Sequence, residues 1–598
     1  MVFEKIRDGK TGRKFSQQLL RTWSEGLLSL QISAEDQPEL DGAIWCPACG
    51  RIHGRCFEAM YPFLCCAELE EKEQEKQKWI HAAEKLFMWA ERNLSQETGA
   101  FLNDTDGEWK GTTVFNAIQM ADCLKFHRGL LSGTTVEKWS LRLRKAADFL
   151  YDCDFLKENN INYPISNALA LYECAEVLQD EKYSRKAEEW AQIIERHMTE
   201  KKLIFGEGTP RHQLSERGCR PIDIGYNVEE TLPSFALYAF LTKNTNYQEL
   251  ARDSLRAHLA FLLPDGAWDN SFGTRNYKWS YWGGRTSDGC AFGYLLYGKE
   301  EPEFLAAAVK NLELLASCTK GKTLMGGPDY ESAGQQNCIH HTFTHSKVLA
   351  GMIDYRLWEN IPEIRTECEE KTEETSYFPE LATWIVKKGK MRETVTAYDW
   401  EYLPGGHVSG GTLSMLHHRD AGTIMTASVG KYTRIEAANM QEPKGVIQEN
   451  LALRIEKELD GICYSSIYDT QAKVIASDEI VVSGNCKDME HRTLPGGNSS
   501  YEMKYHLEEE GIRIEADFTE GKLICPIISR PEEKIQQEEG KLVIHKKDCD
   551  LEIISNANMN LPYGEKRIFH LSPGLCALRI DVLPQAEKIR MQIVVRPC

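Results

Sequence analysis

The hydrophobic pattern of this chain changes its period near residue 360, and this change constrains the fold more than any other feature. Before that point, apolar residues recur at the spacing of helices, and beyond it they alternate with polar residues as in half-buried strands. At 598 residues the chain is also longer than a single hydrophobic core usually grows. We therefore predict a helical N-terminal domain followed by a separate β domain.

The helical part contains two kinds of segment that alternate along the chain. Segments with one charged face are predicted to be outer helices, at 75–93, 134–152, 181–199, 245–263 and 302–317. More apolar segments lie between them and are predicted to be inner helices, at 54–70, 111–128, 163–178, 228–243, 288–298 and 340–356. A further helix over about 12–30 would complete six hairpins, so we predict an (α/α)6 toroid over residues 1–362.

The remaining residues predict a linker and a β domain. Residues 363–380 are polar and charged, which is typical of a linker. Residues 381–598 contain at least ten segments with period-two alternation, separated by turn signals. We predict that they form an antiparallel β-sandwich, which makes the whole chain a multidomain α+β protein.

Composition and charge exclude several classes of protein. The net charge of −19 argues against general nucleic-acid binding. No apolar run approaches the ~18–20 residues that would cross a bilayer, and the N-terminal residues lack the apolar core of a signal peptide. Nineteen cysteines without a secretory signal suggest reduced thiols. We expect a cytoplasmic protein without membrane or nucleic-acid partners, and the sequence is compatible with a homo-oligomer.

Residues 265–290 form the segment that is richest in binding chemistry. It is too rich in glycine for a helix and too polar for a core strand, and such long loops commonly line a cleft. Trp279 and Trp282 could stack on a sugar ring, while Arg275, Lys278 and Arg285 could hold a carboxylate. The alternative is that the loop folds over the rim of the toroid, with its aromatic residues in a small satellite core.

Carboxylates near predicted helix starts suggest acid/base catalysis. Glu229, Glu230, Asp269 and Asp288 are the candidates, because glycoside hydrolysis needs a pair of carboxylates on opposite sides of the sugar. For Glu229, Glu230 and Asp288 the competing interpretation is helix capping, since acids in a first turn complement the helix dipole. Asp269 lies within the aromatic loop and has no obvious capping role.

Other polar residues also lie at starts of the inner helices. If the ring forms, all six starts face one end of the barrel, so His53, Arg55, Asn167, Tyr226 and His341 would complete one pocket. Asn167 could instead bind the backbone, because a buried amide must be hydrogen-bonded. His341 is four residues before a second histidine, a spacing that can bind a metal, but a general base, a substrate contact or a packed side chain is the favoured interpretation. We expect no catalytic metal or cofactor.

The sequence CPACGRIHGRC places Cys46, Cys49, His53 and Cys56 in a C-x2-C-x3-H-x2-C pattern. In a reducing compartment this pattern could form a compact structural zinc site. In the competing interpretation the cysteines are small packing residues and His53 lies in the pocket beside Arg55. His53 cannot easily serve both purposes.

A toroid followed by a sandwich resembles the heparinase II/III-like carbohydrate-active enzymes, which include polysaccharide lyases and related α-toroid glucuronidases. The resemblance implies an Asn that neutralises the uronate carboxylate, with Tyr and His as base and acid, and Asn167 and Tyr226 occupy plausible positions. The segment GGHVSGGTLS is the nearest match to the Gly-Gly-His-x-His-x-Asp-like opening of the sandwich. It keeps His407, but Ser409 and Gly411 replace the other metal-binding residues.

These observations lead to one main functional hypothesis and two alternatives. The main hypothesis is a glycoside hydrolase, similar to a glucuronidase, which removes an acidic sugar from oligosaccharides or glycosides by carboxylate acid/base catalysis. The first alternative is a β-eliminating lyase that uses Tyr226 with His341 or His407, and Asn167 with an arginine as a carboxylate clamp. The second is a carbohydrate-binding protein without catalytic activity. A lyase would leave an unsaturated, ultraviolet-absorbing product, a hydrolase a saturated one, and a binding protein none.

Overall fold

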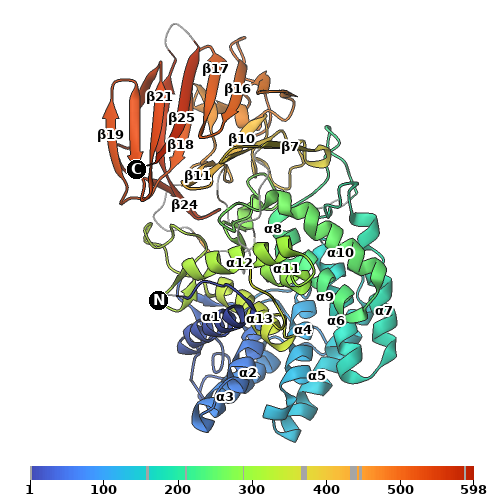
Figure 1. Ribbon diagram of the computed structural model, residues 1–598. Coiled ribbons are helices and arrows are strands. Elements are labelled where there is room, and N and C mark those ends of the chain that lie inside the picture. Colours follow the sequence, from blue (N-terminus) through green and yellow to red (C-terminus); the bar gives the residue numbers. More distant parts are fainter. Residues whose placement is uncertain are drawn as a thin grey trace.

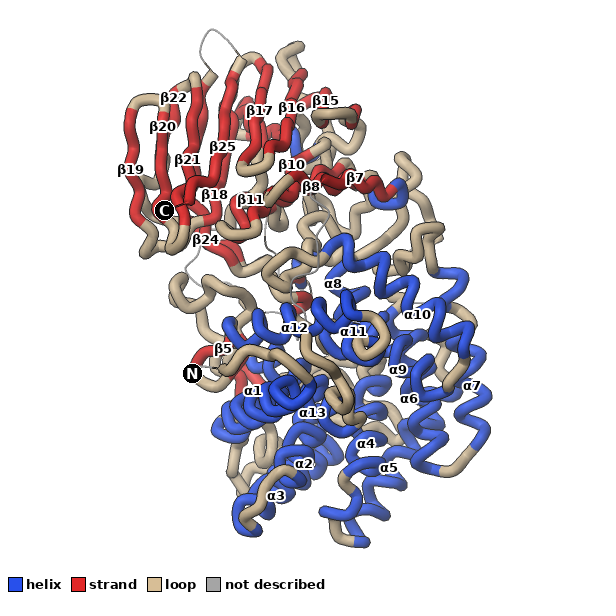
Figure 2. Tube along the Cα trace, viewed as in Figure 1, coloured by secondary structure: helices blue, strands red, loops and turns tan. Residues whose placement is uncertain are grey.

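The chain forms a helical domain and a β domain that pack end to end (Figures 1 and 2). The computed structural model describes residues 3–155, 160–208, 212–286, 288–364, 373–430, 432, 435, 441–442, 448–584 and 588–597. Helices occupy the N-terminal part of the chain and strands the C-terminal part, so the predicted change of secondary structure near residue 360 is confirmed. Among the described residues, no helix is both long and apolar enough to cross a membrane.

The helices form the predicted double ring. The inner ring consists of α2 (Met60–Glu68), α4 (Thr113–Phe126), α6 (Asn162–Leu178), α9 (Leu232–Thr242), α11 (Ala291–Tyr297) and α13 (Ile339–Asp354). Each of these helices contacts the next, and α13 contacts α2, so the ring closes. The outer helices are α1 (Gly9–Ser29), α3 (Glu73–Asn93), α5 (Gly133–Asp152), α7 (Glu181–Ala191), α10 (Thr245–His258) and α12 (Pro302–Ser317).

Burial explains why the two rings differ in sequence. Every residue of α4 from Thr113 to Leu124 is buried, because inner helices are covered on all sides. Helix α5 instead buries one stripe, which includes Trp139, Leu143 and Leu150, and exposes its charged face to water. This difference is the one on which the sequence prediction of inner and outer helices depended.

Short elements connect the helices and begin two of the inner segments. The first inner segment starts as the 3₁₀ helix η1 (Gly54–Ala59), and the fourth starts as α8 (Ile224–Tyr226) followed by the π-helical turn η4 (Asn227–Thr231). The other short helices are η2 (Arg128–Leu130), η3 (Ile194–His197), η5 (Leu259–Phe261), η6 (Asn276–Lys278), η7 (Pro379–Leu381) and η8 (Ser466–Tyr468). Three small hairpins are β1 (Trp45–Cys46) with β2 (Arg51–Ile52), β3 (Trp279–Ser280) with β4 (Gly283–Gly284), and β5 (Thr319–Lys320) with β6 (Thr323–Leu324).

The β domain contains three antiparallel sheets. The first has the order β11 (Gly422–Thr426), β10 (Thr412–His418), β9 (Met391–Thr396), β8 (Thr383–Lys388) and β7 (Glu373–Phe378). Strand β7 thus begins within the segment 363–380 that we predicted as a linker; residues 365–372 of that segment lie outside the described residues. The second sheet has the order β13 (Ile462–Ser465), β12 (Arg454–Leu459), β18 (Lys522–Ile528), β24 (Leu575–Leu583) and β22 (Asn558–Asn560), with β23 (Ile568–His570) also paired to β24.

The third sheet has the order β14 (Lys473–Ala476), β15 (Ile480–Asn485), β16 (Ser500–Glu508), β17 (Gly511–Phe518), β25 (Ile589–Pro597), β21 (Cys549–Ser555), β20 (Lys541–His545) and β19 (Lys534–Glu538). Along β16 every second residue is buried, as expected for a sheet with one face toward a core. Side chains of all three sheets, among them Leu416, Ile514 and Ile580, meet in one hydrophobic core. This arrangement confirms the predicted antiparallel sandwich.

The five-stranded sheet lies between the rest of the β domain and the toroid (Figure 1). All residues of β9 and β10 are buried, on both faces, although isolated antiparallel sheets usually expose one face. The reason is that β9 contacts the toroid: Arg392 donates to the backbone carbonyl of Leu262, and Thr394 donates to Asp269 over 2.7 Å. The two domains therefore share a continuous interface.

Candidate active site

Starts of the inner helices bring charged side chains together at one end of the ring. Arg55, on η1, makes a double contact with Glu58, with atoms 2.5 and 3.1 Å apart, and lies 3.4 Å from Asp288, just before α11. Lys347, on α13, completes the group: its ammonium lies 2.8 Å from Asp288 and also contacts Glu58. Burial opposes the ionisation of Glu58, but the charges of Arg55 and Lys347 outweigh it and lower the pKa of that carboxyl.

A second group surrounds the phenol of Tyr226. Its hydroxyl accepts a hydrogen bond from the Lys278 ammonium over 3.1 Å and lies 2.6 Å from the hydroxyl of Thr286. The guanidinium of Arg275 lies 3.9 Å from the centre of the Tyr226 ring, a cation–π contact. The backbone carbonyl of Thr286 also accepts from Arg55 over 2.8 Å. Thr286 therefore connects the two groups.

The π-helical turn η4 carries Glu229 and Glu230, and neither caps its own helix, although Glu229 accepts from the amide of Cys290 at the start of α11 over 3.3 Å. Glu230 accepts from the side chain of Asn162 over 2.9 Å, and Glu229 lies 3.0 Å from Nε2 of His345. Burial, reinforced by the charge of Asp288, raises the pKa of Glu230 to about 8, so this carboxyl is mostly protonated at neutral pH. Burial also raises the pKa of Glu229. Such π turns often occur at functional sites.

Three residues of the loop 265–290 point toward the β domain and away from this centre. Asp269 accepts from Ser271 and from Thr394 of β9, each over 2.7 Å. Arg285 donates to the backbone carbonyl of Leu571 over 2.6 Å. Trp279 belongs to a hydrophobic cluster shared with strands of the β domain. The alternative of a satellite core thus describes Trp279 well, and nothing in these contacts places Asp269 or Arg285 in a pocket.

Trp282 and His341 remain beside the centre. The Trp282 ring meets those of His345 and His341 edge-on, with centroids 4.5 and 5.7 Å apart. Its indole nitrogen donates to the backbone of Met325 over 2.8 Å, which fixes the ring. Burial, followed by the charge of Arg285, holds the pKa of His341 well below its usual range, so its imidazole is neutral at pH 7.

Three other predicted pocket residues make structural contacts. The amide of Asn167 donates to the carbonyl of Leu150 on α5 over 3.3 Å, which is the backbone-binding alternative. The ring of His407 lies between the backbone carbonyls of Trp400 and Val408, at 2.7 and 3.2 Å. His53 does not join Arg55, because its Nε2 faces the thiol of Cys338 at 3.7 Å.

Besides Thr286, four residues of the centre are absent from the sequence-based site. They are Glu58, Asn162, Glu207 and Lys347, all buried. Glu207 pairs with Arg275 over 3.2 Å, and burial raises its pKa to about 7 despite that charge. The available signal was a charged residue inside an otherwise apolar inner segment, which applies to Glu58 and Lys347. Glu207 precedes α8 in an irregular stretch and carried no such signal.

The whole structure is a helical toroid with polar residues gathered at one end and an antiparallel sandwich packed against it. Sequence profiles of the ulvan lyase N-terminal and C-terminal domains match residues 20–373 and 375–597. The chain is also 35% identical over 606 residues to a broad-specificity ulvan lyase of Formosa agariphila, covering 98% of this chain and 94% of that one. The chain therefore belongs to the ulvan lyase family.

Solved structures share the fold at much lower identity. The chondroitin AC lyase of Streptomyces coelicolor A3 in complex with chondroitin sulphate superposes with a TM-score of 0.50 at 8% identity, over 98% of this chain and 79% of that one. A heparan sulfate lyase of Pedobacter heparinus gives a TM-score of 0.43 at 10% identity, over 99% and 88% of the two chains. The family match, together with the fold shared with the chondroitin AC lyase, confirms the predicted resemblance to toroid-plus-sandwich polysaccharide lyases.

The prediction of a glycoside hydrolase similar to a glucuronidase is wrong. The family and the curated relative are lyases, which favours the alternative of β-elimination. The structure supplies a physical reason for the error. Asp288 is paired with Arg55 and Lys347, and Asp269 faces the β domain. Two carboxylates that the sequence suggested as acid/base groups, Asp288 and Asp269, are therefore bound to other side chains in the structure.

Proposed function

We propose that the protein is a lyase that cleaves a uronate-containing polysaccharide, or its oligosaccharides, by β-elimination. This reaction removes the proton on the carbon next to the uronate carboxylate and expels the oxygen of the glycosidic bond, which leaves a carbon–carbon double bond conjugated to the carboxylate. An enzyme must therefore neutralise the carboxylate, accept one proton and supply another to the leaving oxygen.

The surroundings of Tyr226 are the observation that carries this proposal. The Lys278 ammonium lies 3.1 Å from the Tyr226 hydroxyl and the Arg275 guanidinium lies against its ring. Positive charge this close stabilises a phenolate, the form that a tyrosine needs in order to act as a base. The hydrogen bond with Thr286 fixes the hydroxyl in position. Tyr226 would accept the proton from the sugar, and the resulting phenol could protonate the leaving oxygen.

The electrostatics of the centre support an anionic substrate. The charges of Arg55 and Lys347 are balanced by Glu58 and Asp288, so the positive charge that supports this substrate is that of Arg275 and Lys278, near a Glu230 that is mostly protonated. Arg275 and Lys278 would hold the uronate carboxylate and so increase the acidity of the adjacent carbon. The imidazole of His341, beside Trp282, is kept neutral by burial and by Arg285, so it is a weaker base than an ordinary histidine and the proton is assigned to Tyr226.

The test is to incubate the purified protein with ulvan and record the ultraviolet absorbance of the unsaturated uronate together with the release of new reducing ends. We expect both signals to rise together. Tyr226→Phe should lower kcat by about 10²–10⁴-fold, the usual contribution of a positioned acid/base group. Tyr183→Phe is the matched control, because it removes a hydroxyl that donates to Asp148 between two outer helices, α7 and α5. New reducing ends without absorbance would disprove elimination, and full activity of Tyr226→Phe would remove Tyr226 from the mechanism.

A further inference from the structure

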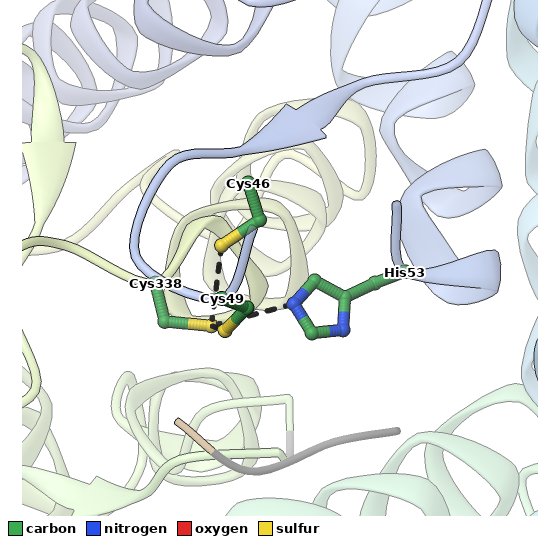
Figure 3. Close-up of side chains that lie close together, drawn as sticks. All are labelled: Cys46, Cys49, His53 and Cys338. Carbon is green, nitrogen blue, oxygen red and sulfur yellow. Dashed lines mark hydrogen bonds between the residues drawn. The ribbon is translucent and has the colours of Figure 1, made fainter. Parts of the chain in front are cut away.

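Three thiols and one imidazole meet at the point where the helical ring closes. Cys46 lies at the end of β1 and Cys49 in the turn before β2, while His53 immediately precedes η1. The fourth side chain comes from the other end of the domain: Cys338 immediately precedes α13. Figure 3 shows the four side chains pointing toward one another from these separate segments. One ligand atom from each side chain lies within 4.8 Å of all the others.

The distances agree with the edges of a metal-centred tetrahedron. Zinc–sulfur bonds of ~2.3 Å and zinc–nitrogen bonds of ~2.0–2.1 Å imply ligand separations of about 3.6–3.8 Å. The Cys338 sulfur lies 3.8 Å from that of Cys46, 3.4 Å from that of Cys49 and 3.7 Å from Nε2 of His53. A small contraction or expansion of these contacts would accommodate an ion.

Local structure prepares this arrangement. The first two cysteines lie in a hairpin turn, where the amide of Gly50 donates to the carbonyl of Cys46 over 2.9 Å and Gly50 adopts a φ of 63°. That left-handed conformation favours glycine, and it allows the chain to turn so that both thiols face the same side. Cys46, His53 and Cys338 are buried, and Cys49 is only partly exposed. Burial leaves no wide opening for a substrate, which is typical of a structural metal rather than a catalytic one.

We propose that Cys46, Cys49, His53 and Cys338 bind one structural zinc ion. Three soft thiolates and one imidazole in tetrahedral reach are the ligand set that zinc prefers, and the set has no open position for water. Cys56 completes the C-x2-C-x3-H-x2-C pattern of the sequence, but in the structure Cys338 takes its place as the fourth ligand. Cys56 is buried as well, but its thiol is not part of the group.

This zinc ion would join the first and last inner segments of the toroid. His53 and Arg55 are two residues apart, and α13, which begins directly after Cys338, carries His341 and Lys347. Arg55 and Lys347 both contact Glu58 and Asp288 across the same junction. The ion would thus hold in place two segments whose side chains meet in the candidate active site. It would stabilise the domain by contributing its binding free energy to the folded state.

A second group of potential ligands among the described residues has a different character. Cys65, His127 and Asp354 also lie within reach of one another. However, the carboxylate of Asp354 already accepts from the hydroxyl of Tyr61 over 2.8 Å and lies 2.9 Å from Nε2 of His127. These hydrogen bonds account for the group without an ion, so we do not extend the proposal to it.

The first experiment measures zinc by elemental analysis in the full-length protein, purified without added metal. We expect about one zinc ion per chain. Cys338→Ser should lose at least about nine-tenths of it, whereas the matched variant Cys56→Ser should retain it. The proposal would be overturned if the wild-type protein, refolded with zinc, held less than about a tenth of a zinc ion per chain. Loss of zinc from Cys56→Ser with retention in Cys338→Ser would overturn the ligand set.

A second experiment does not depend on whether Cys338→Ser folds. Wild-type protein is refolded with Co²⁺ in place of zinc, and its absorption spectrum should show intense visible bands of tetrahedral cobalt and thiolate charge-transfer bands. Cys338→His should keep the ion but weaken the charge-transfer bands, because it replaces one thiolate ligand. Octahedral, weakly absorbing cobalt would contradict the proposal.

The same side chains could instead form a disulfide, and alkylation followed by mass spectrometry distinguishes the two. A zinc site predicts reduced thiols at Cys46, Cys49 and Cys338 that react only after a chelator has removed the ion. A disulfide that includes Cys338 in the freshly purified protein would overturn the proposal.

Discussion

At the scale of single residues, the candidate active site is a set of buried charges that depend on one another. Two positive side chains, Arg55 and Lys347, face two negative ones, Glu58 and Asp288. All of them except Asp288 are almost completely buried. Burying a charge is costly, and a buried pair is maintained only while both partners are present. Each substitution in this group therefore tests stability as well as function.

Lys347→Met should destabilise the protein by about 3–5 kcal/mol, because it leaves Glu58 and Asp288 short of one positive charge in a buried place. The free energy of unfolding is measured by urea denaturation, followed by tryptophan fluorescence. Lys186→Met is the control, since Lys186 pairs with the exposed Glu189 and such surface pairs contribute ~0–1 kcal/mol. Equal effects of the two substitutions would mean that the buried group does not stabilise the fold.

Glu230 predicts a specific dependence of stability on pH. Its pKa is raised to about 8 in the folded protein from an ordinary value of 4.5, so between these values the folded state holds a proton that the unfolded state has lost. The contribution of Glu230 is therefore fully present below about pH 4.5 and is lost as the pH rises through about 8. Glu230→Gln, which can still accept from Asn162, should make the slope of the unfolding free energy less negative by about 1.4 kcal/mol per pH unit in this window. An unchanged slope, measured by urea denaturation at several pH values, would show that Glu230 is ionised in the folded state.

At the scale of elements, the π-helical turn η4 and the hairpin β3–β4 are fitted to one another. Gly283, on β4, lies against Glu229, and a Cβ atom at this position would lie 2.0 Å from Oε1 of that side chain. The backbone carbonyl of Glu229 also accepts from the amides of Asp288 and Gly289 over 3.2 and 3.1 Å. A larger residue at position 283 could pack here only if the Glu229 side chain moved away.

Gly283→Ala should displace the Glu229 side chain from His345 and destabilise the protein by about 1–3 kcal/mol, the usual cost of overpacking. It should also lower the rate of elimination, because Tyr226 immediately precedes the displaced turn. Thermal unfolding and the absorbance assay measure the two effects. Gly133→Ala, where an added Cβ meets nothing within 4 Å, is expected to change neither of them. If Gly283→Ala kept full stability and activity, the position of the turn η4 would not matter for either property.

At the scale of the whole molecule, the loop 265–290 joins the domains as well as lining the candidate site. Arg285 donates to the Leu571 carbonyl of the β domain and also bonds the hydroxyls of Tyr330 and Tyr432, at 3.0 and 3.2 Å. Trp279 and Tyr281 share a hydrophobic cluster with Met415 of the β domain. Lys278 of the candidate site is thus carried by a loop that the β domain supports.

Arg285→Leu should weaken the docking of the two domains, because it leaves the Leu571 carbonyl and two tyrosine hydroxyls without this donor. Calorimetry should then resolve two unfolding transitions, or a wider separation of them than in the wild-type protein. Arg513→Leu, on an exposed part of β17 where Arg513 pairs with Glu508, is the matched control. A single transition unchanged by Arg285→Leu would assign the coupling of the domains to other contacts.

Local pattern alone predicted much of the fold. The apolar inner segments and the amphipathic outer segments correspond to helices of the two rings, because the period and the width of an apolar stripe depend only on neighbouring residues. The alternation beyond residue 381 predicted the sandwich for the same reason. Polar residues at helix starts were informative too: Arg55, Tyr226, Asp288 and His341 lie at or beside the centre.

The tertiary structure decided what sequence spacing cannot express. Glu58 meets Lys347, Arg55 meets Asp288, and Cys46 meets Cys338, although each pair is more than 200 residues apart. Closing the ring creates these contacts, and with them the burial that keeps Glu230 protonated and the partners that neutralise Asp288. The pattern of residues determined which helices and strands form, because that depends on local period. Which side chains face one another, and so which chemistry the centre supports, followed only from the packing of distant segments.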